Sequence, residues 1–179
     1  MSVAALEIVA MEPWHAAAIE AQASQAQTLG LTVEMDEDYG RHLIDNPGEA
    51  WCAIEGGRVV ALFGLIEVFV ARQATAWAVL SGEIGRHHLA ITRFCAERIR
   101  ACGYARIEAI VECGDAEQLL ARFPDLTPGE LLELLNFTAF ATPGTRWARA
   151  CGLRAAAVLR CYGAASETHM LFERIGGQV

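Results

Sequence analysis

Residues 75–112 read TAWAVLSGEIGRHHLAITRFCAERIRACGYARIEAIVE and carry the pattern strand, helix, strand. Thr75–Leu80 is a short, almost uninterrupted apolar run, which predicts a buried strand. Apolar residues recur at helical spacing from Ile84 to Cys102, and Gly103 follows where a helix commonly ends. Ala105–Glu112 alternates between polar and apolar residues and predicts a second strand. Together they form a βαβ unit, so we expect the two strands to be parallel.

A hairpin with a glycine turn precedes this unit. Trp51–Glu55 and Arg58–Val70 are strand-like runs separated only by Gly56-Gly57, a pair typical of two-residue hairpin turns. Further upstream the sequence predicts a strand, a helix that begins with a proline and a helix that ends before Asn46-Pro47-Gly48. These three elements are expected at Leu6–Ala10, Pro13–Gln25 and Asp36–Asp45.

The region after the βαβ unit has a different character over residues 113–144. Proline and glycine breakers there separate two short helices, expected at Ala116–Arg122 and Glu130–Phe137. A helix capped by Thr145 and ended by Gly152 should follow, and then two strands, near Ala156–Tyr162 and Thr168–Arg174. We interpret residues 1–179 as a single mixed α/β domain in which 113–144 form a helical insert.

The charge is unevenly distributed along the chain. The net charge is −8; residues 1–70 hold 2 Arg against 11 acidic residues, and residues 71–179 hold 12 Arg against 11. An acidic N-terminal part without a clustered basic surface argues against a nucleic-acid-binding module. Because no apolar run approaches the ~20 residues of a membrane-spanning helix, we expect no membrane role.

The six cysteines show no pattern of a metal or redox site. None forms a C-x-x-C pair, and no Cys/His cluster has the spacing of a zinc site. Several fall on apolar faces, where a free thiol packs as a small hydrophobic group. We therefore expect no metal and a reduced, cytoplasmic protein, because disulfides are rare in that compartment.

Ser81–His88 joins the first strand of the βαβ unit to its helix and concentrates the candidate chemistry. A helix start offers free backbone N–H groups and a partial positive charge, so it suits a phosphate. Arg86, His87 and His88 stand where the helix dipole disfavours cations unless an anion shares the site. Either Glu83 and solvent offset that cost or an anionic ligand does, and the residues alone favour neither. His88 also falls in the apolar stripe of the helix, which favours a packed structural histidine.

The order of elements resembles the GNAT acyltransferase superfamily over nearly the whole chain. The resemblance rests on the glycine-turn hairpin, on the strand Thr75–Leu80 that leads into the long helix, and on Gly103 followed by a strand. Arg146–Leu153, RWARACGL, resembles the family's late helix, and His169–Arg174, HMLFER, is similar to the closing strand of small acetyltransferase-like proteins encoded by bacteriophages. This resemblance implies a GNAT-like α/β fold, with splayed parallel strands in a mixed central sheet flanked by helices.

The resemblance also implies an activity and a cofactor. GNAT proteins transfer an acyl group, often acetyl, from CoA, and their fourth strand and the following loop bind the pantetheine arm and the pyrophosphate through backbone N–H groups. The acceptor would be a small-molecule or peptide amine, and the acidic residues 1–70 suit a cationic one. The cofactor-binding residues carried onto this sequence are Val79, Leu80, Ser81, Gly82, Gly85, Arg86, His87 and His88.

Three departures from the family pattern favour an alternative function. The pyrophosphate motif Gln/Arg-x-x-Gly-x-Gly/Ala falls on 83–88, so Arg86 and His88 occupy positions where glycine allows close approach to phosphate. Ala148 stands where many members carry a tyrosine that protonates the departing thiolate, and 113–144 are inserted before the late helix. The alternative is a catalytically degenerate GNAT-fold structural or accessory protein of a bacteriophage particle, located in the host cytoplasm or the virion.

Acylation of an amine needs a group that removes its proton. Glu67, near the end of the long hairpin strand, and Glu112, at the end of the strand after the long helix, are the best-placed candidate bases. A solvated carboxylate at the sheet edge is the alternative for each. His87 is a weaker candidate, for which a surface role is the alternative. The helix Glu130–Phe137 is expected to face the core; at the domain edge it would instead contact a second copy or virion proteins.

Overall fold

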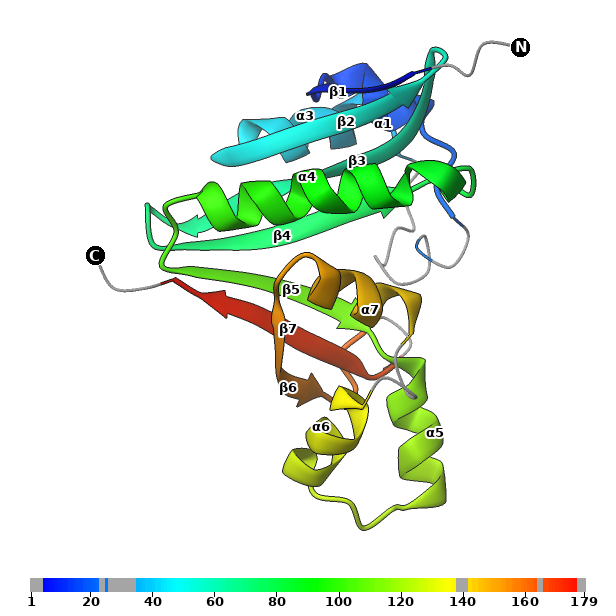
Figure 1. The fold of residues 1–179 in the computed structure, drawn as a ribbon, viewed down its shortest axis with the longest axis vertical. Coiled ribbons are helices and arrows are strands. Elements are labelled where there is room, and N and C mark those ends of the chain that lie inside the picture. The colour runs from blue at the N-terminus through cyan, green and yellow to red at the C-terminus, as the bar shows by residue number, and fades with distance from the viewer. Residues whose placement is uncertain (1–4, 23–24, 26–34, 138–141, 164–165, 177–179) are drawn as a thin grey trace. The chain divides into compact units, whose positions relative to one another are not determined.

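The computed structural model of the chain describes residues 5–22, 25, 35–137, 142–163 and 166–176. The chain forms two compact units, residues 1–95 and 96–179, and the boundary between them falls inside the helix α4 (His88–Ala101). Figure 1 labels the elements of both units. Each unit is described by itself.

The first unit is built on four antiparallel strands that pair in chain order (Figure 1). Gly56 and Gly57 form the turn between the second and third strands with φ of 54° and 82°, in the left-handed region that glycine adopts most readily. This confirms the predicted hairpin and the strand that follows it. The four strands are β1 (Leu6–Ala10), β2 (Gly48–Glu55), β3 (Arg58–Phe69) and β4 (Gln73–Leu80).

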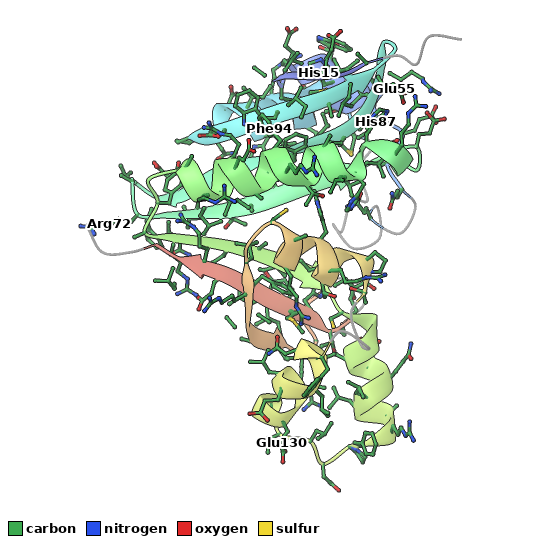
Figure 2. All side chains as sticks on the ribbon, in the orientation of Figure 1. His15, Glu55, Arg72, His87, Phe94 and Glu130 are labelled. Carbon is green, nitrogen blue, oxygen red and sulfur yellow. The ribbon has the colours of Figure 1, made fainter. Side chains whose placement is uncertain are left out.

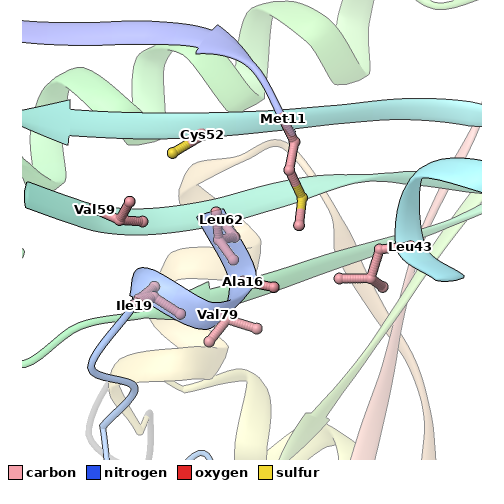
Figure 3. Packing of buried hydrophobic residues seen from close by; sticks show 8 residues of the cluster. All are labelled: Met11, Ala16, Ile19, Leu43, Cys52, Val59, Leu62 and Val79. Atoms are coloured by element: carbon pink, nitrogen blue, oxygen red, sulfur yellow. The ribbon is translucent and has the colours of Figure 1, made fainter. Parts of the chain in front are cut away.

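One face of this sheet is covered by two helices, α1 (Pro13–Ala18) and α3 (Glu37–Asp45), which also pack against each other. Cys52, Leu62 and Val79 are neighbours in one row across β2, β3 and β4, so strand alternation places them on the same face. Figure 3 shows the core that they form with residues from both helices: Met11, Ala16, Ile19, Leu43, Cys52, Val59, Leu62 and Val79.

Aromatic residues pack on the opposite face. Trp51 and Phe63 are cross-strand neighbours on β2 and β3. Both contact Phe94 of α4 edge to face, with ring centroids 5.2 and 5.8 Å apart. This is a favourable geometry for aromatic pairs. The start of α4 therefore packs on the face of this sheet that α1 and α3 leave free.

The first helix ends earlier than the sequence pattern predicts. α1 ends at Ala18 instead of continuing towards Gln25, because Ile19 has an extended backbone and a buried side chain. Ala21 then forms an isolated β-bridge with Ser81. Pairing with a distant strand end has overridden the local helical pattern, which is a common reason for such errors. Positions 23–24 of the predicted helix lie outside the described residues.

In the described part of the second unit, three strands pair antiparallel in the order β5, β7, β6, and three helices follow the end of α4. α6 packs against β6 and α5, and α7 packs against β5. Each of these elements was predicted, with small shifts of its ends. They are β5 (Arg106–Glu112), α5 (Gly114–Arg122), α6 (Pro128–Asn136), α7 (Pro143–Ala150), β6 (Arg154–Leu159) and β7 (His169–Ile175).

Two details of the second unit differ from the sequence-based expectation. Thr142, not Thr145, is the N-cap of α7, because its side chain accepts a hydrogen bond from Thr145 N and the helix begins at Pro143. In α6, Leu131 is buried as expected, but Phe137 is 65% exposed. Residues 138–141 of the predicted insert lie outside the described part. The single-domain interpretation and the parallel pairing of β4 with β5 stay predictions.

None of the six cysteines, all of which lie among the described residues, forms a disulfide. Burial raises the pKa of the Cys52 thiol to about 12, so this side chain stays protonated and packs as an apolar group. Within the described ranges, no group of three or more His, Cys, Asp or Glu side chains is placed to hold a metal ion. None of the helices in those ranges is long and apolar enough to span a membrane.

Gly40 allows α1 and α3 to approach closely, because a Cβ at this position would overlap the backbone carbonyl of Pro13. We expect Gly40→Ala to lower the free energy of unfolding by about 1–3 kcal/mol, the usual cost of overpacking. Urea unfolding followed by circular dichroism measures this change. Gly129→Ala is the control, since Gly129 lies in α6 and a Cβ there meets no atom within 4 Å. Equal stabilities of the two variants would contradict the close approach.

Candidate functional site

The loop that follows β4 is closed by hydrogen bonds of its own backbone. Ile84 N donates to Ser81 O at 3.3 Å, and His87 N donates to Ile84 O at 2.8 Å. Glu83 N donates to the Ser81 hydroxyl at 3.0 Å. These turns lead through the short 3₁₀ helix η1 (Gly85–His87) into α4. The loop is therefore an ordered turn whose shape is determined by this chain's own hydrogen bonds.

A buried carboxylate holds this loop against the β2–β3 hairpin. Glu55, the last residue of β2, is 7% exposed, and its Oε2 lies 3.0 Å from His87 Nε2 (Figure 2). The other carboxylate oxygen forms an ion pair with the Arg86 guanidinium. A buried charge without partners is costly, so Glu55 needs these contacts. Sequence reasoning missed Glu55; the available signal was an acidic residue at the end of an apolar strand, directly before the glycine turn.

A second ion pair joins the same two segments. Arg58, which follows the glycine turn, has its Nη1 2.6 Å from Glu83 Oε2, and both side chains are exposed. Glu83 and Arg86 of the loop are thus each paired with an opposite charge on the hairpin. Arg86 was predicted to bind the cofactor. Its charge is engaged by Glu55, although 59% of its side chain remains exposed.

The other predicted cofactor-binding residues have different environments. Val79 is a core residue with 2% exposure, whereas Leu80 is half-buried and donates its backbone N–H to Gln25 Oε1 at 2.6 Å. Gly82 and Gly85 are exposed, and a Cβ at either position would meet no atom within 4 Å. A ligand therefore has open access to the backbone at these two glycines but not to the side chain of Val79.

The two histidines of the loop have the opposite environments to those predicted. His87, for which a surface role was expected, is 8% exposed and lies against Glu55, whereas His88, expected to pack in the apolar stripe, is exposed. The cause is the 3₁₀ turn over Gly85–His87, because 3.0 residues per turn change the phase counted from Ile84. Both predicted environments were wrong.

The two candidate bases lie in different units. Glu67 Oε2 accepts a hydrogen bond from Ala71 N at 2.9 Å, so this side chain closes the turn between β3 and β4. From the position opposite Glu67, β4 runs six more residues to Leu80, about 20 Å at strand spacing. Glu112, the last residue of β5, lies opposite His169 of β7 in the second unit. Glu67 is thus not brought to the loop, and both catalytic roles stay predictions.

Comparison with known proteins identifies the fold. No model of a protein family and no curated protein matches the sequence. Ard1 from Thermoplasma volcanium matches with a TM-score of 0.64 and 15% identity, over 97% of this chain and 99% of its own. An aminoglycoside 6'-N-acetyltransferase from Enterococcus faecium matches with a TM-score of 0.59 and 12% identity, over 85% and 89% of the two chains. The chain has the GNAT fold.

A third GNAT structure adds a ligand to the comparison. GphF, a GNAT-like decarboxylase solved in complex with isobutyryl-CoA, matches with a TM-score of 0.65 and 12% identity, over 94% of this chain and 98% of its own. At such identities the likeness concerns the fold alone. It confirms the predicted GNAT-like α/β fold class.

The two ion pairs of the loop should contribute differently to stability, because Glu55 is buried and Glu83 is exposed. We expect Glu55→Gln to lower the free energy of unfolding by about 1–3 kcal/mol, since the buried ion pair with the Arg86 guanidinium is lost. Glu83→Gln is the control and should cost at most about 1 kcal/mol, because its pair with Arg58 is exposed. Thermal and urea unfolding measure both changes. A larger loss for Glu83→Gln would contradict the assigned role of Glu55.

Proposed function

We propose that this GNAT-fold chain is an acyl-CoA-dependent N-acyltransferase that uses acetyl-CoA and acylates a cationic amine. The observation that carries the proposal is the turn after β4, where Gly82 precedes η1, Gly85 begins it, and a Cβ at either glycine would meet no atom within 4 Å. Backbone N–H groups in this position suit phosphate oxygens. The isobutyryl-CoA complex of GphF and the aminoglycoside acetyltransferase among the matched structures support the cofactor class and the amine class.

The residues of the loop fit a CoA pyrophosphate through backbone groups and one cation. Gly82 and Gly85 would accept close approach of the phosphates, and Arg86 would turn part of its exposed guanidinium from Glu55 towards them. His87 would stay with Glu55 and hold the start of α4 in place. When bound, the cofactor supplies an activated thioester. Val79–Ser81 would lie along its pantetheine arm, as the family resemblance implies.

The acceptor class follows from charge. Exposed acidic residues concentrate in the first unit; on α3, Glu37 and Asp38 share a single partner, Arg41. The negative electrostatic potential of such an acidic surface attracts a cationic small molecule or peptide. Glu67 and Glu112 are the bases that we propose for the amine proton, and a cytoplasmic reaction fits the free thiols.

The proposal predicts how Arg86→Gln changes cofactor affinity. Titration calorimetry with acetyl-CoA should show binding by the unmodified protein and about tenfold weaker binding by Arg86→Gln, which loses a charge-assisted hydrogen bond. Arg72→Gln is the matched control, because it removes the same charge at the β3–β4 turn (Figure 2). Release of free thiol in the presence of a polyamine measures acyl transfer. Absence of both binding and transfer at millimolar acetyl-CoA would contradict the proposed function.

A second candidate is a catalytically degenerate GNAT-fold structural or accessory protein, as in a bacteriophage particle. The observation that favours it is at α7, where Ala148 is buried at the position of the expected tyrosine. The exposed Phe137 at the end of α6 would then contact a second copy or virion proteins. Acetyl-CoA binding without thiol release, together with oligomers in light scattering that Phe137→Ser abolishes, would favour this candidate over the enzyme.

A further inference from the structure

The last residues of β4 present a row of backbone groups on the side away from β3. Ser81 N donates to Val60 O of β3 at 3.0 Å. In an antiparallel ladder, successive residues direct their backbone groups to opposite sides of the strand. Ala78 and Leu80 therefore direct theirs away from β3. Backbone groups at a strand edge of this kind are a template for any extended group that carries amides.

Two glutamines from the N-terminal part of the first unit fill this edge. The Gln25 carboxamide donates to Ala78 O at 3.4 Å and accepts from Leu80 N at 2.6 Å. Gln22 N donates to Leu80 O at 2.9 Å, and Gln22 Nε2 donates to Ser81 O at 3.0 Å. One side-chain amide thus makes the donor and acceptor pair that a neighbouring strand would make. The bonded residues are separated by more than fifty positions in the sequence.

We propose that Gln25, assisted by Gln22, competes with the pantetheine arm of acyl-CoA for the end of β4. This inference rests on the proposed function. The pantetheine arm carries two secondary amides, each with one N–H and one C=O, and it needs the same donors and acceptors on the strand as the Gln25 carboxamide. Leu80 N cannot donate a full hydrogen bond to both at once. Cofactor binding therefore requires that the Gln25 side chain leave Ala78 and Leu80, and the free chain holds its own site closed.

The ion pairs of the loop also oppose cofactor binding. Arg86 is paired with Glu55, and Glu83 is paired with Arg58, so the neighbouring phosphate position is also satisfied within the chain. The half-buried Gln25 side chain differs from these ion pairs in one respect: it occupies the strand edge and not the phosphate position. Its removal should therefore change affinity for the pantetheine part of the cofactor, with no change in the dependence on salt.

The test compares acetyl-CoA affinities by titration calorimetry. Gln25→Ala should bind about tenfold more tightly than the unmodified protein, since the hydrogen bonds lost are those of the free state. Gln25→Asn, whose side chain is one methylene shorter, should also bind acetyl-CoA more tightly. It replaces Gln25→Ala in the test if that variant folds poorly. Gln73→Ala is the matched control, because it makes the same change at the opposite end of β4. It should bind as the unmodified protein does.

A second measurement is made without cofactor. Amide hydrogen exchange by NMR should show that Leu80 N–H exchanges at least tenfold faster in Gln25→Ala than in the unmodified protein, while the amides of the β2–β3 pairing keep their rates. Unchanged or weaker acetyl-CoA affinity of Gln25→Ala, with clear binding by the unmodified protein, overturns the competition and leaves the proposed function intact. Failure of every variant to bind millimolar acetyl-CoA overturns the proposed function and the competition with it.

Discussion

The buried Glu55 carboxylate is the interaction on which the loop after β4 depends. Its burial at the end of β2 removes water from a charged group, and the protein compensates with the Arg86 guanidinium and the His87 ring. Both partners lie at the start of the helical segment that leads into α4, so the desolvation cost of one carboxylate places that segment against the hairpin turn. The position of this loop against the hairpin thus follows from an electrostatic requirement within the first unit.

The same polar groups serve stability in the free chain and would serve ligand binding. Arg86 is paired with Glu55, and the Leu80 amide is bonded to Gln25, and we propose that a CoA molecule uses the same two groups. In the loop after β4, Gly82 and Gly85 have open space at the Cβ position. A site whose donors are already satisfied has to exchange one set of hydrogen bonds for another, which lowers net affinity.

Most elements of the fold were predictable, and the errors have physical causes. Turn glycines, breakers and apolar periodicity located each strand of the described residues, because each signal depends on neighbours within a few residues. The predicted extent of α1 was wrong because Ala21 pairs with Ser81. The environments of His87 and His88 were wrong because a 3₁₀ turn shifts the helical phase by a fraction of a turn, which is enough to exchange an inner and an outer position.

Local sequence therefore specifies the glycine-turn hairpin, the strand–helix–strand unit and the position of the loop between β4 and α4. Which partners the polar groups of that region have depends on contacts between segments far apart in the chain, such as Gln25 with Leu80 and Glu55 with His87. Sequence periodicity reports which side of an element is apolar, but it does not report which distant polar group meets a buried charge or an open strand edge. Those pairings exist only after folding has removed water from the groups involved, and for this reason the tertiary structure alone determines them.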